Sequence, residues 1–389
     1  MFSFFIFFSP VFSAIEEPVH HVIYSNNDFG SKYFRIPAIC TAQDGTLVTA
    51  TDQRFYNSGD LPQAIDVLIR RSKDHALSWE APITIAGGDT TTFGYGDPSL
   101  VVDKKTGAII CVFNGGPGIH SSTPEVPTRQ YYCISFDHGA SWSDPEEITA
   151  FFYGINCTDT FRRENWKFCF ISAGKGVCSE SGRIMFVGVV KYIDGSGYYD
   201  YLLYTNDLGK TWKVSKEYAC HTGDESKVEQ LVNGSILMSI RNGGGYRYFA
   251  ISNDDGDTWE PYYTRYDLRD PYCNGEILRF TSIKNGDDKN RLLHTNLDSQ
   301  NGRQNLTVKM SYDEGETWPI VKVIKSGSSI YSTATIDTDG AIMLYWENSE
   351  GDDIQMTVTR LTVEWLTDGQ DTYTPPAKRN KNVNYSGKN

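Results

Sequence analysis

Nine charged or phenolic residues lie at similar distances from short x-Gly turns that recur along the chain. Four of them lie nine or ten positions before the nearest turn glycine: Arg35, Asp97, Glu225 and Tyr331. Three lie seven to nine positions after it: Arg54, Arg241 and Glu347. Asp60 and Arg303 lie in the longer connections that follow second strands. Residues equally far from a hairpin turn lie side by side on its two strands. The offsets therefore predict that all nine side chains gather at the end of the fold opposite the turns.

These residue types, brought to one place, suit an acidic ligand. Arginines that meet at one point repel one another unless an anion is bound between them. The planar guanidinium group offers a carboxylate two parallel hydrogen bonds. For any single residue a solvated strand end is the simpler explanation, but a common offset from four different turns favours one pocket. We expect its ligand to carry a carboxylate or a phosphate.

The elements that must position this pocket carry a second repeat of the form S-x-D-x-G-x-T-W. Ser252 to Trp259 matches it, and three further copies keep its Asp, Gly and Trp at residues 135–142, 205–212 and 311–318. A fifth copy at residues 72–79 has Ala76 in place of the glycine. Such a box suits a turn between two strands, because Asp bonds the nearby backbone and Gly accepts a positive φ. Five copies in order indicate a repeat architecture.

Each unit of the repeat is expected to begin with a tight turn between short apolar strands. These turns are predicted at residues 44–45, 106–107, 181–182, 233–234, 285–286 and 339–340, and the first five are each followed by a box. Strand, tight turn, strand, strand, box turn and strand make a four-stranded unit. We therefore predict an all-β fold, a six-bladed β-propeller of four-stranded antiparallel blades. A two-sheet sandwich is the alternative, but it does not explain six regular units.

The two ends of the chain differ from its middle in composition. Residues 1–14 form an apolar run that is too short to span a bilayer and ends in small residues, which predicts a cleaved secretory signal, with an ordered N-terminal strand as the alternative. Residues 15–370 would then be the propeller domain, and the polar residues 371–389 a disordered tail. Four glycosylation sequons, at Asn156, Asn233, Asn305 and Asn384, agree with a secreted or cell-surface protein that has no integral membrane segment.

Charge and cysteine content exclude some classes of protein. The formal net charge of −13 argues against nucleic acid as a partner, and no basic run offsets it. The eight cysteines lack the spacing of zinc pairs. They are either disulfide-bonded, with Cys157, Cys169 and Cys178 the closest group, or buried free thiols. No metalloprotease or P-loop motif is present, so we expect neither a metal nor a cofactor.

The segment Tyr33-Phe34-Arg35-Ile36-Pro37 resembles the Y/F-R-I-P motif of the exo-α-sialidase (neuraminidase) family, and the five boxes resemble its Asp-boxes. The resemblance extends from about residue 20 to residue 366. Boxes alone also occur in other secreted propellers, whereas their combination with the R-I-P motif is specific to the family.

The resemblance implies a role for each of the nine residues. The substrate-binding residues would have two tasks. The carboxylate of sialic acid would be clamped by Arg35, Arg241 and Arg303, together with Glu347. The N-acetyl and O4 side would be bordered by Asp97 with Arg54. In the first set, Glu347 would act by holding Arg35 in place.

The catalytic residues that the resemblance implies are Tyr331 as nucleophile, Glu225 as its base and Asp60 as acid and base. The family often has E-S-x-x-x-E-L, whereas this chain has its second acid, Glu229, one position earlier, which makes Glu229 a rival to Glu225. Glu225 keeps the 16-residue spacing to Arg241 that the family has, and we prefer it.

The chemistry of a sialoside agrees with these roles. Its anomeric carbon carries a carboxylate, which would repel an anionic nucleophile but not a neutral tyrosine. We expect a retaining exo-α-sialidase, a monomer that acts on sialylated glycans. A trans-sialidase, a sialic acid lectin without activity and a structural Asp-box propeller are the alternatives. The linkage preference would depend on loops at the rim, and residues 150–175 look like an insertion over the mouth of the pocket.

Overall fold

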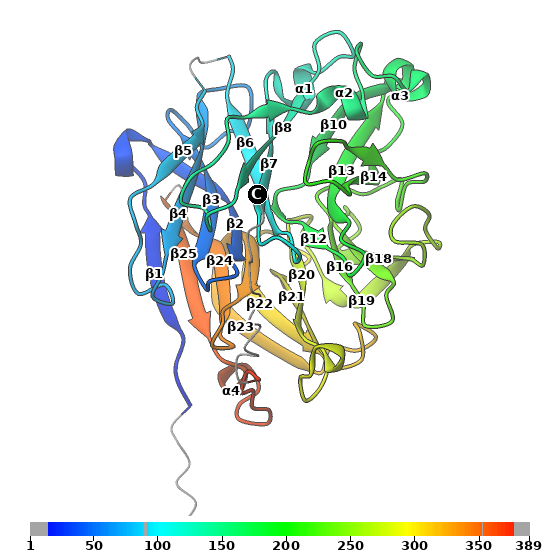
Figure 1. The fold of residues 1–389 in the computed structure, drawn as a ribbon. Helices are drawn as coiled ribbons and strands as arrows, with labels where there is room; N and C mark the ends of the chain where they lie inside the picture. The colour runs from blue at the N-terminus through cyan, green and yellow to red at the C-terminus, as the bar shows by residue number, and fades with distance from the viewer. Residues whose placement is uncertain (1–14, 89–91, 352, 377–389) are drawn as a thin grey trace, which may run out of the picture.

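The computed structural model describes residues 15–88, 92–351 and 353–376. The predicted signal at residues 1–14 and the sequon at Asn384 lie outside these ranges. Antiparallel sheets follow one another around a ring, so that β1 from the start of the described chain lies beside β25 from its end (Figure 1). The predicted all-β propeller class is thereby confirmed, and the sandwich is excluded.

Four sheets each form a separate unit of the ring. The first contains β2 (Tyr33–Thr41), β3 (Leu47–Arg54), β4 (Ile65–Ser72) and β5 (Ile83–Ala86). The second contains β6 (Tyr95–Val102), β7 (Ile109–Gly115), β8 (Arg129–Ser135), β9 (Glu146–Glu147) and the parallel β11 (Gly174–Lys175). The third contains β10 (Trp166–Ile171), β12 (Val177–Cys178), β13 (Ile184–Tyr192), β14 (Tyr199–Thr205) and β15 (Lys213–Val214). The fourth contains β16 (Lys227–Gln230), β17 (Ile236–Ile240), β18 (Tyr246–Ser252) and β19 (Tyr263–Arg269).

The rest of the ring is one seven-stranded sheet. It contains β20 (Glu276–Thr281), β21 (Arg291–Leu297), β22 (Gln304–Ser311), β23 (Ile320–Ile336), β24 (Ile342–Glu350), β25 (Asp353–Leu361) and β1 (Val19–Tyr24). The first half of β23 pairs with β22 and its second half pairs with β24. The predicted number of six units therefore depends on dividing β23 into two strands. β1 is the outer strand of the last unit, which fits the lack of a box after the sixth turn.

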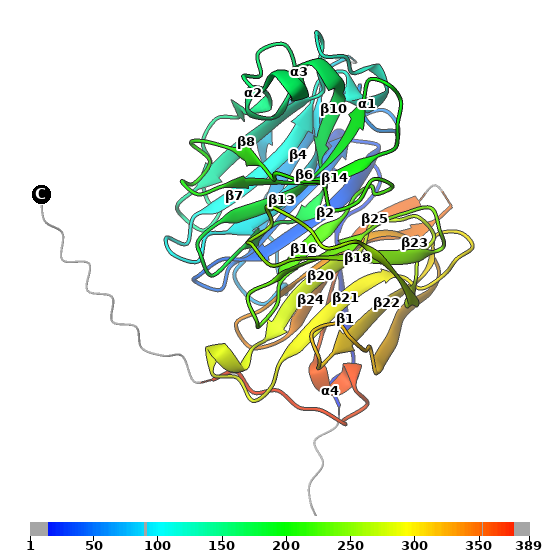
Figure 2. The ribbon, with the colours of Figure 1, turned by 90° about the vertical axis from the view of Figure 1, so that its right-hand side faces the viewer.

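Short helices lie in the connections. They are η1 (Asp28–Gly30), α1 (Gly118–Ser121), α2 (Thr149–Phe152), α3 (Thr160–Asn165), η2 (Ile283–Asn285) and α4 (Val363–Leu366). The tight turn predicted at residues 285–286 is wrong, because η2 and the residues after it form a longer loop between β20 and β21. The first three α-helices gather at one end of the molecule and α4 lies at the other (Figure 2). No helix within the described ranges is both long and apolar enough to cross a membrane.

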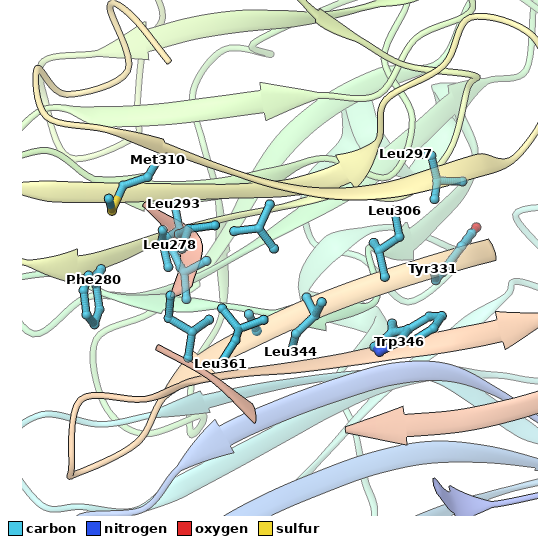
Figure 3. Packing of buried hydrophobic residues seen from close by; sticks show 14 of the residues in the cluster. Leu278, Phe280, Leu293, Leu297, Leu306, Met310, Tyr331, Leu344, Trp346 and Leu361 are labelled. Carbon is cyan, nitrogen blue, oxygen red and sulfur yellow. The ribbon is translucent and has the colours of Figure 1, made fainter. Parts of the chain in front are cut away.

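The hydrophobic core lies between neighbouring units rather than inside one of them. The cluster in Figure 3 joins β20–β22 to β23–β25, where Leu293 and Leu306 pack with Leu344 and Leu361. The ring of Tyr331 belongs to this cluster and is only 8% exposed. Because the apolar face of each unit is covered by the next unit, burial of these faces favours a closed ring.

The boxes contribute to this contact between units. In the best copy, both carboxylate oxygens of Asp254 accept hydrogen bonds from Thr258, from its amide at 2.9 Å and its hydroxyl at 2.6 Å. Gly256 has a φ of 91°, and a Cβ there would lie 2.3 Å from Leu202 of the preceding unit. Glycine is therefore required by the turn and by the close approach of the two units.

Two expectations about covalent chemistry and order are settled by the described residues. All eight cysteines are buried free thiols, so the alternative to disulfides holds. The disordered tail predicted from residue 371 is wrong for residues 371–376, because Asp371 accepts hydrogen bonds from Arg291 and Lys289, at 2.8 and 2.9 Å. Tyr373 packs on Phe280 with ring centroids 5.0 Å apart. Residues 377–389 lie outside the described ranges.

Candidate active site

The first strands of three units carry a β-bulge near the end that borders the site. The register shifts between Arg35 and Ala38, between Gly96 and Ser99, and between Ser329 and Ser332. At the first two bulges the residue before a proline is left-handed, with a φ of 62° at Ile36 and 57° at Asp97. A left-handed conformation is unfavourable for a residue that precedes proline, so it persists only where the surrounding structure stabilises it. Bulges of this kind re-aim side chains, and Arg35, Asp97 and Tyr331 all line one cavity.

That cavity has a volume of about 220 Å³. Seven of the nine predicted residues line it: Arg35, Asp60, Asp97, Glu225, Arg241, Arg303 and Tyr331. The other two, Arg54 and Glu347, are buried behind its wall at 1% and 0% exposure. Arg54 was expected to border the ligand, and its position does not support this, whereas Glu347 was expected to hold Arg35. Both act on residues that do reach the cavity. Leu61, Ile119 and Phe170 make part of the wall apolar.

Tyr331 and Glu225 form the centre of the site. The Tyr331 hydroxyl donates a hydrogen bond to Oε2 of Glu225. Arg241 Nη1 donates to the same carboxylate oxygen and to the phenol oxygen, the latter at 3.1 Å. Burial, and then the negative charge of Glu225, raise the pKa of Tyr331 well above its ordinary value. The phenol is therefore neutral at physiological pH, and Glu225 is placed to accept its proton.

Three arginines surround this phenol. The guanidinium carbons of Arg35 and Arg303 each lie 5.6 Å from the centroid of the Tyr331 ring, within the range of a cation–π contact. Arg241 completes the set at the hydroxyl. The arginines come from β2, from the end of β17 and from the approach to β22, so three units of the ring converge here. A small anion in the cavity would offset their mutual repulsion.

Glu347 fixes one of these arginines, as predicted. Its carboxylate accepts hydrogen bonds from Arg35 Nε at 2.9 Å and from the backbone amide of Ile36 at 2.7 Å. It also accepts from the backbone amide of Tyr331 at 3.0 Å. Burial opposes its ionisation, but Arg35 and the two amides outweigh burial and hold the pKa of Glu347 below its ordinary value. A single carboxylate thus positions both an arginine and the nucleophile candidate.

Asp60 lies on the loop between β3 and β4, and its side chain is 77% exposed. Arg54 Nη1 donates to Asp60 Oδ1 at 2.8 Å and also binds the carbonyls of Ser58 and Gly59. Desolvation opposes ionisation, but Arg54 and Arg35 outweigh it and hold the pKa of Asp60 below its ordinary value. A general acid must carry a proton. An anion bound between the arginines would offset their charge and raise the pKa of Asp60.

Asp97 has the opposite electrostatic environment. Burial and the like charges of Asp52 and Asp60 raise the pKa of Asp97 well above its ordinary value. Its backbone amide donates to Asp52 Oδ1 at 2.9 Å, and Asp52 in turn pairs with Arg54 at 2.8 Å. Burial raises the pKa of Asp52 to about 6 although Arg54 opposes the rise. The protonated form of Asp97 is therefore favoured relative to that of a solvated aspartate, and in that form the side chain can donate a hydrogen bond to a ligand oxygen.

The rival carboxylate, Glu229, has a different environment. It accepts hydrogen bonds from Lys175 Nζ and from the backbone amide of Arg279, both at 2.9 Å. It does not line the cavity formed by the described residues. Of the two acids in this motif, Glu225 is the one that contacts Tyr331.

Sequence reasoning missed two residues that its own rule should have found. Asp52 and Asn114 each lie seven positions after a turn glycine, the offset that Arg241 and Glu347 share. Asp52 supports Arg54, whereas Asn114 exchanges two hydrogen bonds with the backbone of Ile171, at 3.0 and 2.8 Å. The offset therefore marks supporting residues as well as those that face the cavity.

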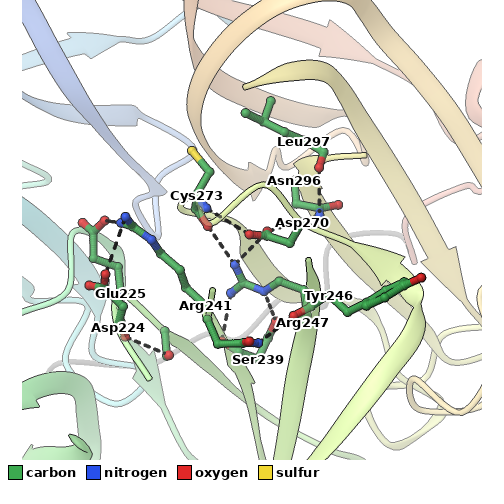
Figure 4. A network of polar contacts seen from close by, with 12 residues as sticks. Asp224, Glu225, Ser239, Arg241, Tyr246, Arg247, Asp270, Cys273, Asn296 and Leu297 are labelled. Carbon is green, nitrogen blue, oxygen red and sulfur yellow. Dashed lines mark hydrogen bonds and ion pairs between the residues drawn. The ribbon is translucent and has the colours of Figure 1, made fainter. Parts of the chain in front are cut away.

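Tyr272 and Asp224 were also missed, and no spacing rule points to Tyr272. Its ring centroid lies 4.3 Å from the guanidinium carbon of Arg241, and Asp224 lies 3.5 Å from Arg241 Nη2. The loop that carries Tyr272 is fixed by the buried pair Arg247 and Asp270, 3.2 Å apart (Figure 4). Arg241 is thus positioned on two sides before any ligand binds.

The expected insertion at residues 150–175 does not close over the cavity. From that segment only Phe170 is among the described residues that line it. The nearby border is formed instead by α1, through Gly118, Ile119 and His120.

Comparisons with known proteins agree with this fold and site. The family model for the BNR repeat-like domain matches residues 53–344. The sialidase of Micromonospora viridifaciens is 32% identical over 344 residues, which cover 84% of this chain and 51% of that protein. The sialidase of Bacteroides fragilis is 31% identical over 310 residues, which cover 75% and 55%. The chain thus spans about half the length of these curated relatives.

Solved structures share the fold at lower identity. The Hadza microbial sialidase Hz136 aligns with a TM-score of 0.78 and 24% identity, over 89% of this chain and 69% of that chain. The intramolecular trans-sialidase from Ruminococcus gnavus aligns with a TM-score of 0.75 and 17% identity, over 87% and 96%. Fold and repeats together define a BNR-repeat β-propeller. Within that class, the chain belongs to the sialidase family.

Proposed function

We propose that this protein is a retaining exo-α-sialidase that removes terminal sialic acids from glycoproteins, glycolipids or oligosaccharides through a tyrosyl intermediate. The observation that supports it best is the contact of Tyr331 with Glu225 inside a set of three arginines. A sialoside has a carboxylate on its anomeric carbon, so arginines that hold the carboxylate place the reacting carbon near the phenol.

In the first step Glu225 accepts the phenolic proton while the Tyr331 oxygen bonds to the anomeric carbon. Asp60 donates a proton to the glycosidic oxygen, and the aglycone leaves as an alcohol. Arg35, Arg241 and Arg303 offset the substrate carboxylate while positive charge develops on the ring. A neutral phenol enters this site with less repulsion than a carboxylate nucleophile would meet.

In the second step Asp60 takes a proton from water as the water oxygen bonds to the anomeric carbon. The bond to Tyr331 breaks, and Glu225 returns the proton to the phenolate. Two displacements at one carbon retain its configuration. Proton NMR of the reaction tests this outcome: α-sialic acid should form first and then mutarotate, and initial release of the β-anomer would contradict it.

Transfer of sialic acid to a sugar is the second candidate. Solved structures of the same fold include the intramolecular trans-sialidases of Ruminococcus gnavus and the leech, so this fold also carries transfer reactions, in those proteins within a single molecule. Hydrolysis and transfer use the same intermediate and differ in the nucleophile that resolves it. Measuring free sialic acid and sialyllactose with and without added lactose separates them, since a hydrolase yields free sialic acid under both conditions.

We also propose that the catalytic domain, predicted as residues 15–370, extends through residue 376, and that the protein is a secreted or cell-surface monomer. The exposed sequons at Asn156 and Asn233 support the location. Expression with the natural N-terminus, followed by mass measurement of the mature chain and its glycans, tests it; an intact residue 1 and unmodified sequons would contradict it.

A further inference from the structure

A second cavity, of about 480 Å³, lies where the third and fourth units meet. The aromatic pocket, as we call it, is lined by rings from five segments of the chain: Phe161, Tyr192, Tyr201, Tyr218, His221, Trp259 and Tyr262. It shares no lining residue with the active-site cavity among the described residues. Concave sites that are mainly aromatic, with a few polar groups, are typical of small-molecule binding.

Two of these rings are exposed yet held in fixed orientations. Tyr218 is 43% exposed, and its ring centroid lies 5.1 Å from Tyr199, 6.0 Å from Tyr201 and 6.4 Å from His221. All three neighbours meet it nearly at right angles, at 73° to 75°. Phe161 is 59% exposed and is held in the same way by Tyr192. Because the rings are already ordered, a ligand that stacks on them costs little additional conformational entropy.

The polar groups of the pocket narrow the class of ligand. The hydroxyls of Tyr192 and Tyr201 lie 2.8 Å apart, and Lys216, Glu217 and Glu260 also line the cavity. Two carboxylates against one ammonium group disfavour an anionic sugar. A neutral hexose fits better, since one face of its ring is made of C–H groups that stack on aromatic rings and its edge carries hydroxyls for charged hydrogen-bond partners.

We propose that the aromatic pocket is a second carbohydrate site that binds a neutral hexose ring. It adjoins the first site through the chain, because Tyr198 lines the active-site cavity while Tyr199 packs on Tyr218. The pocket can therefore hold a glycan whose charged terminal sugars have been removed, or neutral branches of the same glycan. The binding itself does not depend on the proposed activity.

Lactose is the probe, titrated by calorimetry and by saturation-transfer NMR into the full chain carrying Tyr331→Phe. We expect a dissociation constant in the millimolar range, and at least about a tenfold increase on adding Tyr218→Ala, which corresponds to about 1.4 kcal/mol. Tyr218→Phe keeps the ring and should bind lactose within about threefold of the parent. Tyr266→Ala is the matched control, because Tyr266 is 75% exposed and lies outside the pocket.

Three results would overturn the proposal. Loss of lactose binding when N-acetylneuraminic acid saturates the protein would place lactose in the active-site cavity. Lactose binding that is unchanged by both Tyr218→Ala and Phe161→Ala would place it elsewhere on the surface. Absence of lactose binding would mean that the rings do not recognise a neutral sugar. This conclusion would also hold if the rings bound a cation such as tetramethylammonium in a Tyr218-dependent way.

Discussion

The backbone amide of Tyr331 donates a 3.0 Å hydrogen bond to Oε2 of Glu347. The same carboxylate binds the side chain of Arg35. Tyr331 and Glu347 belong to the last unit of the ring and Arg35 to the first. Ring closure between β1 and β25 therefore also assembles the candidate site, which joins the stability of the fold to the position of its nucleophile.

Glu347→Gln should weaken substrate binding more than turnover. The amide keeps one acceptor but loses the charge that orients Arg35, so we expect KM to rise about tenfold and kcat to change less. Steady-state kinetics on a fluorogenic sialoside measure both. Glu350→Gln, an 84% exposed acid of the same strand, is the control and should behave like the parent. A large fall in kcat at constant KM would contradict this, and would mean that the hydrogen bond of Glu347 to the Tyr331 amide matters more than its contact with Arg35.

Glu225→Gln and Glu229→Gln should have different effects: the first should lower turnover, and the second should lower the stability of the fold. The first removes the base beside Tyr331, and we expect kcat to fall at least about a hundredfold. The second leaves Lys175, whose side chain is only 20% exposed, without its partner, so we expect the free energy of unfolding to fall by about 3 kcal/mol while turnover per folded molecule persists. Kinetics and thermal unfolding of both variants check this. Activity lost only in Glu229→Gln would mean that the base is misassigned.

The pH profile should report the pairing of Asp60 with Arg54. Asp60 must be protonated to act as an acid, and Arg54 and Arg35 lower its pKa in the free protein. The alkaline limb of kcat/KM, which reflects the free enzyme, should therefore lie at lower pH than that of kcat, where bound substrate offsets the arginines.

Variants of Arg54 sharpen this test. Arg54→Gln removes the positive charge, so the pKa of Asp60 should rise and the kcat/KM limb should move to higher pH. Arg54→Lys keeps the charge and should leave the limb near its original position. Unfolding curves for both variants show whether the loss of the partner of Asp52 has disturbed the fold. An unmoved limb in a folded Arg54→Gln would exclude Asp60 as the acid.

Turn offsets predicted which residues lie together because antiparallel register is fixed by the turn. Glu225 meets Arg241, and Tyr331 meets Glu347, as the counting required. The same counting misjudged Arg54. It placed Arg54 beside a ligand, but the strands align Arg35 with Asp52, and the buried Arg54 side chain instead binds Asp52, Asp60 and the loop carbonyls. An offset places a residue at one end of a hairpin, but it does not show whether the side chain faces the active-site cavity or lies buried behind the residues that line it.

The end of the chain was misjudged for a different reason. Composition alone predicted disorder from residue 371, since that segment is polar. Its order depends on Asp371 reaching Arg291, a buried arginine 80 positions earlier in the chain. A single long-range ion pair leaves no local pattern, so no local property of the sequence could reveal it.

Asp371→Asn should destabilise the fold at neutral pH. The pKa of Asp371 is lowered in the folded protein, because Arg291, Lys289 and Tyr312 outweigh the effect of burial. Its ion pair therefore stabilises the fold above the ordinary aspartate pKa, and that contribution is lost as the pH falls. We expect a loss of about 3 kcal/mol at pH 7 and a smaller difference at pH 3.

Denaturant unfolding at the two pH values measures this difference. Asp368→Asn is the control, because Asp368 is 73% exposed and its pair with Lys322 should contribute little. Equal stability of Asp371→Asn and the parent protein at pH 7 would show that the segment does not support the ring.

Trapping the covalent intermediate shows which side chain is the nucleophile. The protein is incubated with a 2,3-difluorinated sialic acid, whose C2 fluorine leaves as fluoride when the adduct forms and whose C3 fluorine slows hydrolysis of that adduct, and its peptides are examined by mass spectrometry. We expect one sialosyl adduct on the Tyr331 phenol, which is lost in Tyr331→Phe while that variant still binds sialic acid. An adduct on Glu225 or Asp60, or steady fluoride release by Tyr331→Phe, would contradict this expectation.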